Sequence, residues 1–162
     1  MATRQEKKEK AAAKKLTWHE FAAMGGGAVL ALSLFLPWYS VERRGTIGDG
    51  KPGPGDFTGW EVHDIQRWLL LGAAVAPFIL AYIVARSHKL SWKPGEVTMI
   101  VGMIAFALIL LNGLIMGKPG DTVDMKFQIG CLVGLFGSLL LMIGGTLRQA
   151  LSADAKKPPG VM

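Results

Sequence analysis

The sequence predicts an all-α membrane protein, an antiparallel four-helix transmembrane bundle with a long first outer loop. Four apolar stretches without a charged side chain are the main observation. About 20 residues in a helix cross the roughly 30 Å hydrocarbon core of a bilayer, so each stretch is a candidate span. The distribution of basic residues and the positions of the tryptophans support the same fold. The predicted spans are residues 21–41, 68–85, 97–116 and 127–147.

The basic residues give the predicted spans an orientation. Twelve of the 18 lysines and arginines lie in residues 1–20, 86–96 and 148–162. The positive-inside rule therefore places both termini and the 86–96 loop in the cytoplasm, and the protein in the plasma membrane as a multi-pass protein. We assign residues 1–20 to a basic cytoplasmic tail, residues 21–147 to the membrane domain, and residues 148–162 to a disordered cytoplasmic tail.

The first span is predicted to be a retained helix, because no small-x-small pattern of a cleaved signal peptide follows it. The outer loop at residues 42–67 comes next. Its middle is rich in glycine and proline, which favours turns over packed structure. Thr58, with Glu61 three residues later, has the spacing of a capping box. We therefore expect a short helical turn at the end of this loop, leading into the second span.

The remaining spans follow with short connections, which predicts antiparallel neighbours. Pro77 lies in the middle of the second span and is expected to kink that helix. Tryptophans lie close to the span ends, at Trp18, Trp38 and Trp68, where amphipathic rings prefer the headgroup region. They support the predicted boundaries.

Small residues at four-residue spacing are the predicted helix-packing positions. In a bilayer, helices associate through close approach of their backbones, which glycine and alanine permit. The pattern leaves open whether the contacts lie within one chain or between chains. These positions are Gly27, Ala31, Gly72, Ala76, Gly113, Gly117, Gly130, Gly134, Gly137 and Gly144.

The pattern of reactive side chains predicts no catalytic, cofactor or metal site, and no enzyme activity. The spans contain no ionisable Asp, Glu, Lys, Arg or His, which argues against proton-coupled transport. The single cysteine, Cys131, excludes an intrachain disulfide. The basic residues follow membrane topology without a nucleic-acid-binding motif, so no nucleic-acid partner is expected. A candidate outer contact remains, formed by Trp60, Glu61, His63 and Asp64, which supplies too few ligands for zinc.

Four short motifs carry a resemblance to a group of proteins. They are Leu-Phe-Leu-Pro-Trp-Tyr-Ser at 34–40, Gly-Trp-Glu and a following Asp within 59–64, Pro-Gly at 119–120, and Gly-Gly near the end of the fourth span. In these features the chain resembles the uncharacterised actinobacterial family of small integral membrane proteins with four transmembrane helices. The resemblance implies four spans and transfers no activity. Claudins share the long first loop, but the cysteine pair of their loop is missing here.

Two functional hypotheses follow from the sequence. The first is a non-enzymatic accessory, scaffold or envelope-associated membrane protein whose outer loop contacts a membrane-protein partner or a second copy. The alternative is an oligomeric channel or facilitator for a small solute, lined by Asn112, Ser138 and Thr146. Beyond the lipid bilayer, the sequence identifies no partner.

Overall fold

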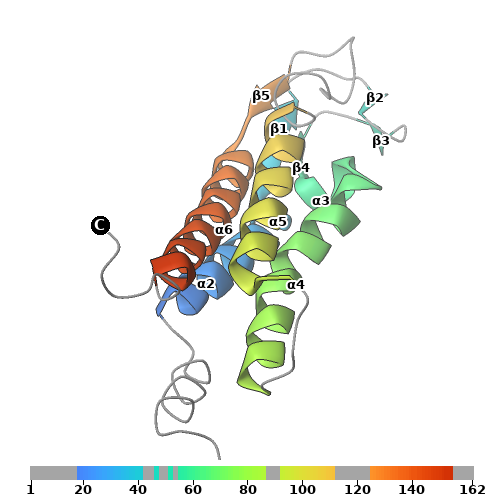
Figure 1. Cartoon of the computed structure of the whole chain (residues 1–162). Helices are drawn as coiled ribbons and strands as arrows, with labels where there is room; N and C mark the ends of the chain where they lie inside the picture. Colours follow the sequence, from blue (N-terminus) through green and yellow to red (C-terminus); the bar gives the residue numbers. More distant parts are fainter. Residues whose placement is uncertain are drawn as a thin grey trace, which may run out of the picture.

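The computed structural model describes residues 18–41, 46–47, 51–52, 55–86, 92–111 and 125–154. Four helices pack side by side in this part of the chain (Figure 1). Three of them are long and apolar enough to cross a membrane, namely α4, α6 and α5 when the turn that continues α5 to Leu111 is included. The protein is therefore mainly helical and consistent with a membrane protein, as predicted. The four helices are α2 (Trp18–Ser33), α4 (Gln66–Ala85), α5 (Pro94–Leu108) and α6 (Ile129–Asp154).

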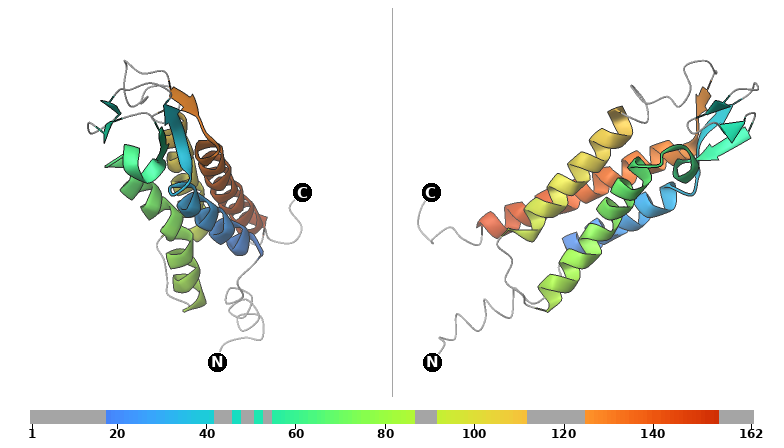
Figure 2. Two further views of the ribbon diagram at one scale, coloured as in Figure 1. Left: turned by 180° about the vertical axis from the view of Figure 1, so that it is seen from behind. Right: turned by 90° about the vertical axis from the view of Figure 1, so that its right-hand side faces the viewer.

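A small antiparallel sheet lies at one end of the helices (Figure 2). Its order is β4-β1-β5, with β1 (Pro37–Val41) between β4 (Gly55–Thr58) and β5 (Met125–Phe127). Tyr39 is opposite Phe57 in one neighbour and Phe127 in the other. A separate pair joins β2 (Thr46–Ile47) to β3 (Lys51–Pro52). The prediction of an all-α protein is wrong in this respect, because three distant segments of the chain form a sheet.

Helix α2 is shorter than the first predicted span. The sequence predicts a helix over residues 21–41, whereas α2 begins at Trp18, ends at Ser33 and is followed by a tight turn into β1. Pro37 explains the early end, because a proline has no N–H to donate to the carbonyl four residues earlier. That carbonyl belongs to Ser33, which accepts from the backbone N–H of Leu36 instead.

The other predicted boundaries differ by smaller amounts. Helix α4 begins two residues before the predicted span at 68–85 and continues through Pro77 to Ala85. Residues 109–111 continue α5 as a π-helical turn, and residues 112–116 lie outside the described residues. Helix α6 extends to Asp154, so residues 148–154 belong to a helix and not to a disordered tail. Residues 1–17 and 155–162 also lie outside the described part of the chain.

Glycines set how closely the helices approach. A Cβ atom added at Gly137 of α6 would lie 2.7 Å from the backbone nitrogen of Leu30 in α2. Gly102 and Gly145 bring α5 and α6 together in the same way, with backbone atoms of the facing helix against the glycine. Gly27 of α2 lies against the carbonyl of Ala74 in α4. Helices α4 and α5 make the sparsest contact of the four neighbouring helix pairs.

Candidate functional site

The end of the molecule that carries the sheet is built around Trp38, which is fully buried. Its indole Nε1 donates a 2.7 Å hydrogen bond to the Ser33 carbonyl that Pro37 leaves without its helical partner. Cβ atoms added at Gly59 or Gly130 would lie 2.6 and 2.5 Å from this ring. The two glycines therefore leave the space for the indole between α3 (Gly59–Val62) and α6. We call β1, β4, β5 and α3 the cap.

Tyr39 and His63 join the strand β1 to the end of α3 within the cap. The Tyr39 hydroxyl and the His63 Nε2 are 3.2 Å apart and form a hydrogen bond. The His63 ring also meets the edges of Trp38 and Tyr39, at centroid distances of 5.8 and 5.9 Å. Burial lowers the pKa of His63 to about 4 and raises the pKa of Tyr39. Both side chains are therefore neutral near pH 7.

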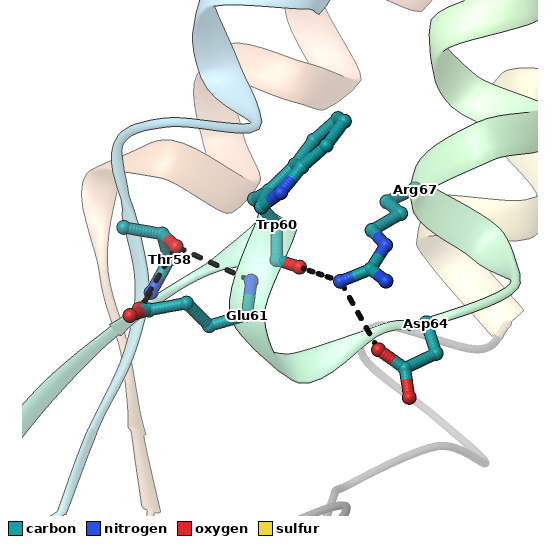
Figure 3. A network of polar contacts seen from close by, with 5 residues as sticks. All are labelled: Thr58, Trp60, Glu61, Asp64 and Arg67. Carbon is teal, nitrogen blue, oxygen red and sulfur yellow. Dashed lines mark hydrogen bonds and ion pairs between the residues drawn. The ribbon is translucent and has the colours of Figure 1, made fainter.

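The predicted capping box is confirmed at the start of α3 (Figure 3). The Glu61 backbone N–H donates to the Thr58 hydroxyl oxygen at 3.3 Å, and the Thr58 backbone N–H donates to the Glu61 carboxylate at 3.0 Å. These reciprocal bonds satisfy two donors that a helix end otherwise leaves free. The backbone N–H of Trp60 donates to the Leu34 carbonyl, which ties α3 to the turn after α2.

Arg67 holds the junction between α3 and α4 (Figure 3). Its Nη1 donates to the Trp60 carbonyl at 3.0 Å and lies 3.1 Å from the Asp64 carboxylate. The guanidinium also stacks over the rings of Trp60 and Trp68, 5.4 and 5.9 Å from their centroids. Phe35 stacks on Trp60 from the other side, with centroids 5.5 Å apart. Phe35 and Trp68 are exposed, so this aromatic cluster forms part of the surface.

The structure gives each residue of the candidate outer contact a partner within the cap or at its junction with α4. Glu61 closes the capping box and Asp64 pairs with Arg67. Trp60 and His63 are half-buried in the two aromatic clusters. The four residues lie along one short segment but do not converge on a common point as ligands would. Within the described residues, no three His, Cys, Asp or Glu side chains form a group able to hold a metal.

An ion pair at the opposite end of the helices was missed by the sequence analysis. Arg148 Nη1 of α6 lies 2.6 Å from the Glu20 carboxylate of α2, and both side chains are largely buried. His19 and Thr98 line a small cavity beside this pair, with a volume of about 10 Å³. That is the space of a single water molecule. The signal was present in the sequence, since Glu20 precedes the first apolar stretch and Arg148 follows the fourth.

The predicted packing positions divide into three groups. In the first group, an added Cβ atom would lie within 3.5 Å of another element; its members are Gly27, Gly134, Gly137 and Gly144. Gly130 also belongs here, because it lies against Trp38 and the turn before it. Ala31 and Ala76 are half-buried, whereas Gly72 faces open space. The third group, Gly113 and Gly117, lies outside the described residues.

Two of the three residues suggested as channel lining bond to their own helix. The Ser138 hydroxyl donates to the Leu135 carbonyl at 2.8 Å, and the Thr146 hydroxyl donates to the Met142 carbonyl at 2.8 Å. Ser138 is completely buried. Asn112 lies outside the part of the chain that the structure describes. The geometry of these hydroxyls therefore gives the channel hypothesis no support.

No protein-family model, curated protein or solved structure matches this chain. The resemblance to the actinobacterial four-span proteins stays a prediction.

Proposed function

We propose that this protein is a non-enzymatic scaffold or accessory protein of the plasma membrane, whose cap contacts a partner outside the cell. The observation that carries the proposal is the packed construction of the cap. The central strand β1 carries the buried Trp38 and Tyr39 and pairs with β4 and β5, and the capped helix α3 follows β4. A linker between spans has no need of such an organised surface. Fixed loops on a rigid support are where binding residues are most often found.

The proposed topology is four antiparallel crossings with both termini in the cytoplasm. Helix α2 has 16 residues, which correspond to about 24 Å. The turn at residues 34–36 and the start of β1 then complete the first crossing of the roughly 30 Å core. The exposed Trp68 and the Trp60–Arg67 cluster lie at the outer interface in this arrangement, where aromatic rings and arginines are favourable. Reporter fusions after residue 154 and within residues 46–52 test the orientation; an external reporter at residue 154 would refute it.

The partner contact is tested with a photoreactive phenylalanine at two matched positions. Phe127 of β5 is 42% exposed in the cap, and Phe136 is 57% exposed in the middle of α6. Benzoylphenylalanine replaces each in turn, and native membranes are irradiated. We expect a discrete protein adduct from position 127 and none from position 136. The absence of a protein adduct at 127, or the same adduct from both positions, would contradict the proposal.

A further inference from the structure

A groove between α4 and α5 opens on the side of the helices. Three of its lining residues are small, Gly72 and Ala73 on α4 and Ala105 on α5. The others are larger apolar residues, namely Leu69, Val101, Ile104 and Leu108. The volume is about 310 Å³. None of the lining side chains is polar, and α4 and α5 are both apolar enough to lie within a bilayer.

The groove exists because α4 and α5 are each held by a different neighbour. Gly27 lets α2 approach α4 on its other side, against Ala74 and Pro77. Gly102 and Gly145 hold α5 tightly against α6. Between α4 and α5 themselves, the Gln66 side-chain amide donates to the Leu108 carbonyl at 3.1 Å and bridges the two helices at the end nearest the cap. The groove is therefore fixed by packing on both sides and is bridged at its outer end.

From this geometry we infer that the groove holds one acyl chain of a membrane phospholipid. The size of the groove favours an acyl chain over a helix as its occupant. A volume of about 310 Å³ is roughly twenty to thirty times the 10–15 Å³ that one water needs by the same measure, which suits a run of methylene groups. A packed helix, with a diameter of about 10–12 Å, needs far more room. Lipid chains are the apolar molecules that surround these helices.

The residues at the outer end fit the rest of such a lipid. Trp68 and Arg67 follow Gln66 directly on α4 and therefore lie at the level where the groove ends. The Trp68 ring is exposed, and the Arg67 guanidinium is about one quarter exposed and stacks on it. An exposed indole beside a cation is typical of the headgroup level of a bilayer. A lipid whose chain fills the groove thus places its headgroup beside the exposed Trp68 ring and the Arg67 guanidinium, which pairs with Asp64.

The inference is tested with a phosphatidylglycerol that carries a diazirine in one acyl chain. The full chain is reconstituted in vesicles of phosphatidylcholine and phosphatidylglycerol, irradiated, and the adducts are mapped by peptide mass spectrometry. We expect adducts concentrated on residues 69–73 and 101–108, above the level on exposed α2 side chains such as Leu32. A uniform distribution over all lipid-exposed residues would overturn the inference.

A matched pair of substitutions separates the groove from the general lipid surface. A Cβ atom at Gly72 or at Gly25 of α2 meets nothing within 4 Å, so leucine fits at either position. Gly72→Leu fills the groove, whereas Gly25→Leu adds the same side chain on another face. We expect Gly72→Leu to remove most of the groove adducts, because the leucine side chain occupies space that the acyl chain would fill. Gly25→Leu leaves them unchanged. An equal yield from both variants would overturn the assignment.

Discussion

The contact between α2 and α6 and the contact between α4 and α5 are both lined with small residues, yet only the first is closed. At the α2–α6 contact, a Cβ atom added at Gly26 or at Gly137 would lie 2.9 or 2.7 Å from backbone atoms of the partner helix. At the α4–α5 contact, Gly72 faces open space above a groove. A small residue thus permits either close backbone approach or a hollow. The neighbours that hold each helix from its other side decide which of the two forms.

The largest expected effect comes from filling the closed contact. Gly137→Leu places a side chain where the Leu30 backbone nitrogen is 2.7 Å from the Cβ position. Because the obstacle is backbone, α2 and α6 must separate, and we expect a loss of about 3 kcal/mol or more in the free energy of unfolding. Unfolding in mixed micelles of increasing denaturing detergent measures the change. A Gly137→Leu variant as stable as the wild type would show that the α2–α6 contact is not the main one.

The ion pair at the inner end of the same contact is the second largest expected effect. Glu20→Gln removes the negative charge that lies beside the largely buried Arg148 guanidinium. We expect a loss of about 2–3 kcal/mol, since breaking a buried pair costs more than the pair itself contributes. Glu96→Gln is the control, because Glu96 pairs with the exposed Lys93 and surface pairs contribute about 0–1 kcal/mol. The same micelle titration compares them, and equal losses would contradict the burial of the Glu20–Arg148 pair.

The closed contact continues into the cap, where Trp38 packs against Gly130 of α6 and His63 packs against Trp38. A pH titration tests this continuation. His63 has a pKa of about 4 in the folded protein, against about 6.5 when exposed. The unfolded chain therefore binds a proton first, and stability falls as the pH decreases from about 6.5 to about 4. Between pH 7.5 and pH 5 we expect a loss of roughly 1–2 kcal/mol that His63→Asn lacks. Parallel pH profiles for the two proteins would mean that His63 is not buried in the cap.

At the open contact, the hydrogen bond from Gln66 to the Leu108 carbonyl is the main polar link in the described residues. Gln66→Leu removes it and is expected to cost about 1 kcal/mol. The change should be local, so hydrogen–deuterium exchange should speed up at residues 66–72 and 105–111 while the α2–α6 contact stays protected. Unchanged exchange at both helix ends would contradict a bridging role for Gln66.

The sequence predicted the helices well where local chemistry dominates and less well where distant segments meet. Apolar length located α4, α5 and α6, and the Thr58–Glu61 spacing located the start of α3. Pro37 could have indicated that the first helix ends early, but the apolar residues around it led to the prediction of a longer span. The sheet was not predictable in this way, because its three strands have only three to five residues each and β5 comes from a different connection than β1 and β4. The candidate outer contact stays a prediction: Trp60 and His63 are half-buried in aromatic clusters, and the exposed Glu61 and Asp64 bond to Thr58 and Arg67.

The smallest expected effect is a gain in stability at the open contact, whereas the same substitution at the closed contact causes a loss. Gly72→Leu introduces the same side chain as Gly137→Leu, but its Cβ meets nothing within 4 Å. Glycine within a helix is less stable than other residues by about 0.5–1 kcal/mol, so leucine at position 72 should stabilise the protein by about 0.5 kcal/mol. Gly25→Leu, on the exposed face of α2, should give a similar gain in the same micelle titration. A large loss at position 72 alone would mean that α4 and α5 close on each other in the membrane, and it would remove the groove together with its lipid.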